Sequence, residues 1–260
     1  TLMWADEATI EESARQQIRN VAQLAWTRGV RVMPDVHYGF GATVGSVIAM
    51  EQAVAPAAVG VDIGCGMTAV RTTLRADQLP DDLGTIRSGI ERAVPVGFAA
   101  HRDEPRMIGR HANLAARLKE QMQGFTNLRA GETARSLVRS KSEHKTIRQV
   151  GTLGGGNHFI ELCVGDDDRV WVTLHSGSRG IGNQLAKVHI KIAQALEHNQ
   201  GIVDRDLAVF LAGTPEMEAY LADLWWAQAY ALLNRDVMLQ AVCDELEHRI
   251  EGIGFEEPIK

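Results

Sequence analysis

A run of three glycines followed by asparagine and histidine is the most unusual feature of this sequence. Gly154, Gly155 and Gly156 lie in the segment 151–161, which reads GTLGGGNHFIE. Glycine lets the backbone take positive φ angles and approach a ligand closely, at an entropic cost that an ordinary loop has no reason to bear. The segment therefore predicts a ligand-binding loop. Dinucleotide binding of the Rossmann type fits poorly, because these glycines precede an expected strand rather than opening a helix.

A β-hairpin is expected directly after the glycines. Strand-forming residues occupy 158–164 and 169–175, and the sequence Gly-Asp-Asp-Asp at 165–168 separates them. This pattern predicts a four-residue loop that pairs Val164 with Arg169.

Two histidines stand at the open end of this hairpin. In the expected register His158 lies directly opposite His175, with Cβ atoms about 4.5 to 5.5 Å apart. Both imidazoles could then bind one metal ion or two neighbouring ions. A slip of one residue would place them on opposite faces, and a single histidine on an apolar strand is more often a core residue.

A second candidate ligand segment is GVDIGCGM at 60–67, which supplies Asp62 and Cys65. The two side chains are three residues apart in a loop that glycines can fold tightly, so both could bind the same ion. The alternative is a buried cysteine beside a capping aspartate. With His158 and His175 the set offers one oxygen, one sulfur and two nitrogen ligands, which suits a borderline or transition divalent ion better than Mg²⁺ or Ca²⁺. A structural zinc finger is disfavoured, because no second CxxC is present.

Polar residues that follow the second histidine could bind a phosphate group. The segment SGSRGIGN at 176–183 offers two hydroxyls, the guanidinium of Arg179 and backbone N–H groups at an expected helix start. An ordinary capped turn is the alternative. Upstream, Asp35 and His37 form an Asp-x-His pair, which is expected to support the metal ligands by hydrogen bonds or to fix a local turn.

The elements that must position these residues are both helices and strands. Apolar spacing predicts helices over 6–27, 79–92, 111–123, 181–196 and 217–250, and short β-branched runs predict strands at 30–32, 43–48 and 68–71. With no internal repeat and no low-complexity linker, the pattern predicts one α+β domain over 1–260, with a glycine-rich strand and loop core surrounded by helices. Helical spacing of Trp225, Trp226 and Tyr230 predicts core packing rather than a base-stacking platform.

Composition and charge exclude several classes of protein. The 260 residues are 45% hydrophobic, 23% charged and 5% aromatic, which excludes collagen-like, disordered and disulfide-scaffold chains. A chain of this length needs no metal to hold it together, so a bound metal would be functional. The net charge of −6 argues against a general nucleic-acid coat. The stretch between Leu128 and Val150 has a local basic excess, which predicts a solvated face or a wall that faces phosphate: Arg129, Arg135, Arg139, Lys141, Lys145 and Arg148.

The cysteines and the termini bear on the compartment. Cys65, Cys163 and Cys243 are odd in number and widely spaced, which indicates a reducing compartment and hence the cytoplasm. No apolar run approaches the roughly 20 residues that span a bilayer, and no signal peptide is expected. Because the sequence starts at Thr1 and not at methionine, a processed or excerpted chain is expected.

Four segments resemble, in content and in order, those of the RtcB family of RNA ligases (tRNA-splicing ligases): MPDVHYGFG, GVDIGCGM, GTLGGGNHFIEL and HSGSRGIGNQ. The resemblance extends from Met33 to about Asp236. It implies the family's own α+β fold and the joining of RNA 3′-phosphate or 2′,3′-cyclic phosphate ends to 5′-hydroxyl ends. It also implies the use of GTP and Mn²⁺, with Zn²⁺ as a possible substitute, through a guanylylated histidine.

The resemblance further implies roles for individual residues. Manganese ligands would be Asp62, Cys65, His158 and His175, with the Cys65 thiolate bridging two ions, and Asn157 would contact the guanylate while Arg179 holds an RNA phosphate. Two family segments have no counterpart here: a His-Asn segment with another metal-binding histidine, and a His-Gly-Ala-Gly segment with the guanylylated histidine. The chain therefore resembles the N-terminal two-thirds of such a ligase, and no catalytic histidine is expected within it.

Two other functions stay open from the residues alone. A metal-dependent phosphohydrolase or cyclic phosphodiesterase would need only the metal centre and the phosphate site. A non-catalytic RNA-binding module would use a structural metal and the basic stretch, and its binding would be sensitive to salt.

Overall fold

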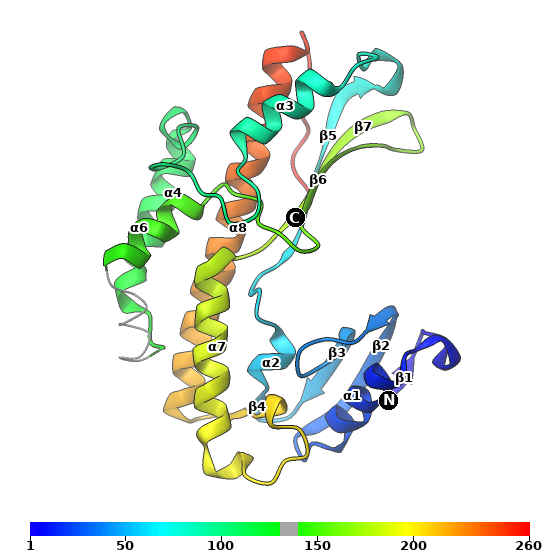
Figure 1. Ribbon diagram of the computed structural model, residues 1–260, viewed down its shortest axis with the longest axis vertical. Coiled ribbons are helices and arrows are strands. Elements are labelled where there is room, and N and C mark those ends of the chain that lie inside the picture. The colour runs from blue at the N-terminus through cyan, green and yellow to red at the C-terminus, as the bar shows by residue number, and fades with distance from the viewer. Residues whose placement is uncertain (131–139) are drawn as a thin grey trace. The chain divides into compact units, whose positions relative to one another are not determined.

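The structure is a computed structural model that describes residues 1–130 and 140–260 (Figure 1). These residues form two compact units. One contains 1–61, 129–130 and 184–224, and the other contains 62–128, 140–183 and 225–260. The α+β class expected from the sequence is confirmed. The single domain over 1–260 stays a prediction, and each unit is described by itself.

The first unit is built on a three-stranded sheet in the order β1-β2-β3. Its strands are β1 (Leu2–Met3), β2 (Thr27–His37), which is parallel to β1, and β3 (Val44–Met50), which is antiparallel to β2. Helix α1 (Glu12–Gln23) buries Ala14, Ile18 and Val21 against the sheet, because these residues recur at helical spacing on one face. Shorter elements complete this unit: β4 (Ala53–Val54) paired with β8 (Phe210–Leu211), and α2 (Pro56–Val59).

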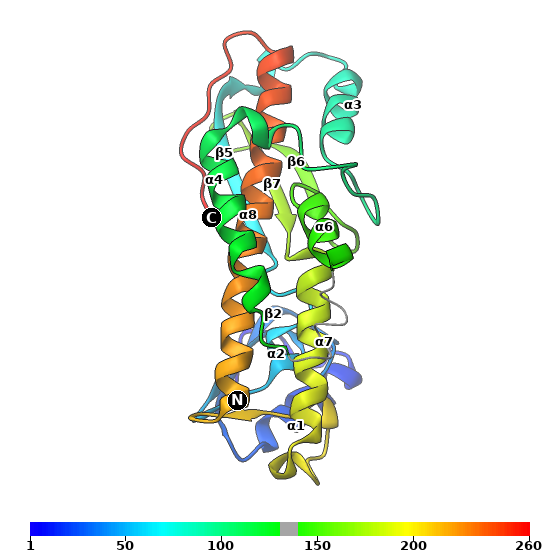
Figure 2. The same ribbon diagram turned by 90° about the vertical axis from the view of Figure 1, so that its left-hand side faces the viewer.

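The second unit holds an antiparallel sheet in the order β5-β7-β6. The strands are β5 (Gly66–Arg75), β6 (Phe159–Val164) and β7 (Arg169–Ser176). Residues alternate along β7 between buried and half-buried, so one face carries Val172 and Leu174 into the core. That face packs on Met238 and Val242 of the long helix α8 (Pro215–Arg249), which runs along the sheet in Figures 1 and 2.

Four more helices belong wholly or partly to this unit: α3 (Gly84–Ala93), α4 (Ala112–Gln123), α6 (Ser140–Gln149) and the first residues of α7 (Arg179–Ala195). Even α8, with its 35 residues, is not apolar enough to cross a membrane, and the same holds for every other helix within 1–130 and 140–260.

Most expected elements are found, with shifted ends. The helix expected over 6–27 begins only at Glu12, because Asp6 caps a separate 3₁₀ turn at Glu7–Thr9 and Ile10 is extended. The helix expected from residue 79 begins at Gly84, after Pro80. Helix α6 was not expected, because its sequence is almost entirely polar.

The hairpin exists, but its expected register is wrong by one residue. Val164 pairs with Val170 and not with Arg169. The N–H of Gly165 donates to the carbonyl of Arg169 at 2.9 Å, which closes a three-residue loop. Asp168 ends that loop at φ 60°, a left-handed conformation that aspartate tolerates and that three-residue hairpin loops require.

The predicted core packing of the α8 aromatic residues is wrong for Trp225, which is 61% exposed. Trp226 and Tyr230 do pack together, with ring centroids 5.6 Å apart and planes 12° apart. Residues four apart share a helix face, whereas adjacent residues point about 100° apart. Trp225 therefore points away from the face that the other two occupy.

The basic stretch is only partly described. Arg135 and Arg139 lie outside the described residues, whereas Lys145 and Arg148 lie on α6. The guanidinium of Arg148 donates to the carbonyl of His101 at 2.6 Å.

Candidate metal centre

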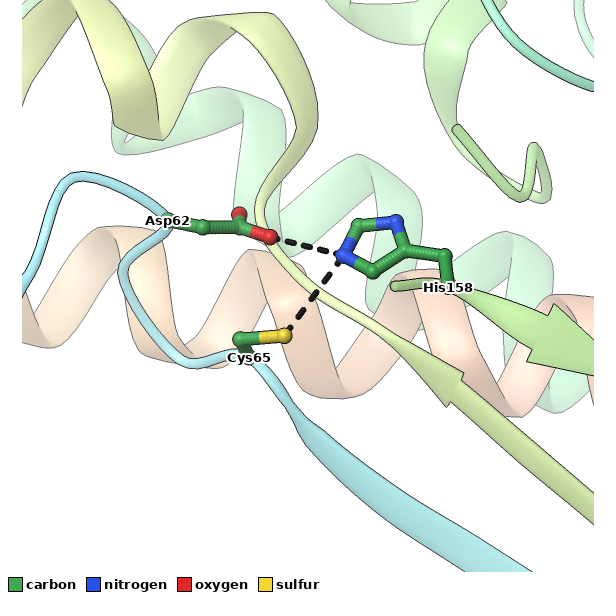
Figure 3. Close-up of side chains that lie close together, drawn as sticks. All are labelled: Asp62, Cys65 and His158. Carbon is green, nitrogen blue, oxygen red and sulfur yellow. Dashed lines mark hydrogen bonds and ion pairs between the residues drawn. The ribbon is translucent and has the colours of Figure 1, made fainter. Parts of the chain in front are cut away.

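The four predicted metal ligands come together in the second unit, and Figure 3 shows three of them, Asp62, Cys65 and His158. Asp62 and Cys65 lie in the loop before β5, His158 directly precedes β6, and His175 lies near the end of β7. Cys65 Sγ lies 3.5 Å from His158 Nε2 and 3.0 Å from His175 Nε2, and His158 Nε2 lies 2.8 Å from Asp62 Oδ2. Single ligand atoms of Asp62, Cys65 and His158 all lie within 4.8 Å of one another.

The two histidines meet although the hairpin register differs from the expected one. In the sheet His175 pairs with Phe159, and His158 stands before the strand. The chain turns sharply ahead of β6 at Gly154 and Gly156, which have φ angles of 92° and 75°. This turn frees His158 from the strand's alternation, and its ring centroid lies 5.5 Å from that of His175.

Backbone carbonyls orient both imidazole rings. Nδ1 of His158 lies 2.7 Å from the carbonyl oxygen of Leu153, and Nδ1 of His175 lies 3.2 Å from that of Asn157. Each Nδ1–H can donate to its carbonyl, which directs Nε2 of both rings toward the Cys65 sulfur. Metal-binding histidines are held by such contacts in other proteins.

The donor set fits a borderline or transition divalent cation. One thiolate, two imidazole nitrogens and a carboxylate suit Zn²⁺ better than Mg²⁺ or Ca²⁺. The contacts of 2.8 to 3.5 Å between these ligand atoms are hydrogen bonds of the metal-free site. Cys65 is exposed, so the alternative of a buried core thiol at this position is wrong.

In the absence of metal, Asp62 and His158 form an ion pair, with Nε2 of His158 2.8 Å from Oδ2 of Asp62. The hydrogen bond to Asp62, with a further one to Cys65, raises the pKa of His158 to about 10. Burial opposes ionisation of Asp62, but the hydrogen bond and the charge of His158 outweigh it and lower the pKa of that carboxyl group. A carboxylate and a cation are thus held together at the position where a metal ion would bind.

The loop after β7 holds the Asp62 carboxylate. Oδ1 of Asp62 accepts hydrogen bonds from the backbone N–H of Ser178 at 3.1 Å and from the Ser178 hydroxyl at 3.4 Å. The Ser176 hydroxyl donates to the carbonyl of Leu153 at 2.8 Å. Both hydroxyls that the sequence suggested for phosphate binding are therefore engaged within the chain.

Arg179 is fixed beside the glycine segment at the start of α7. Its Nε donates to the Thr152 hydroxyl and its Nη2 to the carbonyl of Gly97, both at 3.0 Å. Nη1 has no hydrogen-bond partner within 1–130 and 140–260. Asn157 has an exposed side chain, and its backbone carbonyl contacts Nδ1 of His175.

Asp35 and His37 lie in the first unit, on exposed positions of β2. His37 Nδ1 contacts the carbonyl oxygen of Asp35 at 2.8 Å, a local contact between residues two apart in the strand. Their support of the metal ligands stays a prediction.

Comparison with known proteins identifies the family. A family model described as tRNA-splicing ligase RtcB matches residues 17–257. The chain belongs to the RtcB family. The RNA-splicing ligase RtcB of Escherichia coli (strain K12) is 43% identical over 251 residues, which cover 94% of this chain and 60% of that relative.

More distant RtcB relatives match over a similar extent. The tRNA-splicing ligases RtcB of Methanococcus maripaludis and Aeropyrum pernix are both 26% identical, over 271 and 277 residues. These matches cover 92% and 91% of this chain, and 56% and 57% of the relatives. The chain thus spans less than two thirds of the length of the RtcB proteins it matches.

Asn234 and Arg235 of α8 were not predicted as site residues of this RtcB chain. Asn234 Oδ1 accepts the N–H groups of Gly151 and Thr152 at 2.8 and 3.3 Å, and its Nδ2 donates to the carbonyl of Gly177 at 3.1 Å. Arg235 Nη1 donates to the carbonyl of Gly64 at 2.6 Å and to that of Ser176 at 3.0 Å. Two adjacent helical residues thus tie together the two loops and the end of β7 that carry the candidate metal ligands. The sequence feature that could have indicated these two residues is the polar Asn-Arg-Asp triplet inside an otherwise apolar helical run at 231–239.

We expect Asn234→Ala to lower metal affinity by roughly 10- to 100-fold, the range seen when partners of metal ligands are removed. The same variant should lose about 2 to 3 kcal/mol of stability, because buried backbone groups are left without partners. Isothermal titration with Zn²⁺ and thermal unfolding measure the two effects. Gln240→Ala is the control on the same helix, since that side chain donates to Asp244. Equal metal affinities in the two variants would contradict the role of Asn234.

Gly154→Ala should disrupt the RtcB centre, whereas Gly155→Ala should not. A Cβ at Gly154 would lie 2.0 Å from Arg179 Nη1 and 2.8 Å from His158 Nδ1, on a backbone with φ 92°. A Cβ at Gly155 would approach nothing closer than 4.0 Å. We expect at least a 10-fold loss of Zn²⁺ affinity for Gly154→Ala and less than a twofold change for Gly155→Ala. A tolerated Gly154→Ala would show that the close approach is not needed.

Proposed function

We propose that this chain forms the metal-binding and phosphate-binding part of an RNA ligase that joins 3′-phosphate or 2′,3′-cyclic phosphate ends to 5′-hydroxyl ends. The observation that carries the proposal is the convergence of Asp62, Cys65, His158 and His175 from two loops and the end of β7, in a chain of the RtcB family. The RtcB relatives are named as RNA-splicing and tRNA-splicing ligases, which supports RNA as the substrate.

The donor set would hold two Mn²⁺ ions, for which Zn²⁺ can substitute. Asp62, Cys65 and His158 would bind one ion, while Cys65 and His175 would contribute to the second, since the sulfur contacts both imidazoles. Bound divalent ions supply Lewis acidity, which offsets negative charge on a phosphate group.

The chain's own residues would position the reactants. Arg179, held by Thr152 and Gly97, presents Nη1 toward the glycine segment, where an RNA phosphate would accept its hydrogen bond. By its resemblance to the RtcB family, Asn157 would contact the guanylate of GTP, and its side chain is exposed beside His158. Its carbonyl keeps His175 oriented at the same time.

A joining assay with the intact protein tests the proposal. Two RNA strands are supplied, one with a 3′-phosphate and one with a 5′-hydroxyl, and we expect joined product only when both GTP and Mn²⁺ are present. Arg179→Lys keeps the charge but loses the forked geometry, and we expect at least a 10-fold lower rate.

Two other results would contradict the proposal. Opening of a 2′,3′-cyclic phosphate without GTP, and without joining, would show a phosphohydrolase. Salt-sensitive RNA binding with no turnover under any of these conditions would show a binding module.

A further inference from the structure

A cavity of about 470 Å³ lies in the second unit, apart from the four metal ligands. Its walls come from the end of α3, the loop between α3 and the 3₁₀ turn Ile108–Arg110, and one stretch of α8. Four arginines line it: Arg92, Arg102, Arg106 and Arg110. We call this site the arginine pocket.

The arginines of this pocket are not paired with the carboxylates that line it. None of the four forms an ion pair within 1–130 and 140–260, although other arginines of that part do. Of the wall carboxylates, Glu245 pairs with Arg249 at 3.3 Å, whereas Asp244 lies 3.1 Å from His111, which is a cation only when protonated. Asp103 and Glu104 are the other acidic lining residues. Four guanidinium groups thus face three carboxylates that have no permanent cationic partner, Asp103, Glu104 and Asp244, in a chain of net charge −6.

The lining favours phosphate groups over bases. All four arginines are exposed at the rim, and the apolar lining consists of Ala93, Pro105, Met107 and Ala241. Binding of single-stranded bases relies on stacking against aromatic side chains, and the lining contains no Phe, Tyr or Trp. Guanidinium groups bind phosphate oxygens without reading sequence.

The pocket is joined to the glycine segment through one wall residue. His101 Nε2 lies 3.2 Å from the carbonyl oxygen of Gly151, and its backbone N–H donates to the carbonyl of Arg148 at 3.0 Å. Arg179 contacts Gly97, only five residues before Arg102. Five residues span at most about 18 Å, so a strand whose phosphate is held by Arg179 can reach the pocket within a few nucleotides.

We infer that the arginine pocket binds backbone phosphates of the substrate RNA, at nucleotides outside the reacting ends. The inference deepens the proposed function and rests on its assignment of RNA as substrate. It assigns to Arg102, Arg106 and Arg110 a contact that depends on charge and not on base sequence.

Salt-dependent RNA binding tests the inference with the intact protein. The probe is a fluorescent 20-nucleotide single-stranded RNA with hydroxyl groups at both ends, which cannot be joined. The variant is Arg102→Gln/Arg106→Gln/Arg110→Gln. The slope of log K against log salt is negative, and each lost phosphate contact reduces its magnitude by about 0.7 for a single strand. We therefore expect the magnitude of the slope to fall by about 2. Between 50 and 200 mM salt the unmodified protein should lose about 18-fold more affinity than the variant.

A matched variant removes the same charge elsewhere. Arg19, Arg75 and Arg87 are exposed and paired with Glu12, Asp168 and Glu91, so their triple change to Gln should leave the slope within about 0.5 of the unmodified value. Circular dichroism is used to check that both variants fold. The single variant Arg106→Gln should lower the magnitude of the slope by about 0.7. Equal slopes in the two triple variants would overturn the inference. So would inorganic tripolyphosphate binding to the pocket as tightly as the RNA, since the occupant would then be a free polyphosphate.

The joining assay is run on the same preparations with short strands. If the unmodified protein joins the strands but the two triple variants have equal salt slopes, the RNA-binding role of the arginine pocket is wrong and the proposed ligase function stands. If the slope changes in the arginine-pocket variant but no joining occurs, the pocket binds RNA and the proposed ligase function is wrong.

Discussion

Cys65→Ser is expected to lower the affinity for Mn²⁺ and Zn²⁺ by more than about 100-fold, beyond the 10- to 100-fold cost of losing a partner of a metal ligand. The reason is that the Cys65 sulfur contacts Nε2 of both His158 and His175, and a hydroxyl does not replace a thiolate as ligand for a borderline ion. Metal content after dialysis, measured by mass spectrometry, gives the result.

The fold should persist in this variant. Cys65 is exposed and lies outside the apolar core of the second unit, so the unfolding temperature of the metal-free protein should change by less than about 2 °C. Cys163→Ser is the matched control, because that thiol contacts the hydroxyl of Thr173 on the neighbouring strand β7. Unchanged metal content in Cys65→Ser would show that the thiol is not a ligand.

The second large effect concerns His158→Ala and His175→Ala. Either change should lower Zn²⁺ affinity by more than about 100-fold, and the double variant should add little, since residues that serve one site are not additive. The shared contact with the Cys65 sulfur is the structural basis for this coupling.

Isothermal titration of the two single variants and the double variant measures the coupling. His248→Ala, at an exposed position near the end of α8, is the control and should bind Zn²⁺ normally. If the losses in free energy simply add, the two histidines belong to separate sites.

The clustering of the four candidate ligands could be predicted from the sequence, but the reason given for one contact was wrong. The expected register placed His158 opposite His175, whereas the left-handed Asp168 shortens the loop and shifts the pairing by one residue. The histidines meet because glycines turn the chain ahead of β6. A local pattern can predict that a hairpin forms, but the conformation of one turn residue sets its register.

Helices with a clear apolar face were found from spacing alone, as α1 and α4 illustrate. Helix α6 was missed because its sequence has few apolar positions, so periodicity gives no signal there. Asn234 was missed for a different reason. Its importance comes from contacts with residues 57 to 83 positions away, and such contacts are not encoded in the spacing of neighbouring residues.

X-ray absorption at the zinc edge, recorded on the zinc-loaded protein, tests the central claim most directly. A metal centre formed by Asp62, Cys65, His158 and His175 predicts a sulfur neighbour at about 2.3 Å from zinc, with nitrogen and oxygen neighbours at about 2.0 to 2.2 Å. The sulfur contribution should be present in the unmodified protein and absent in Cys65→Ser. A shell of nitrogen and oxygen alone in the unmodified protein would contradict the metal centre described above.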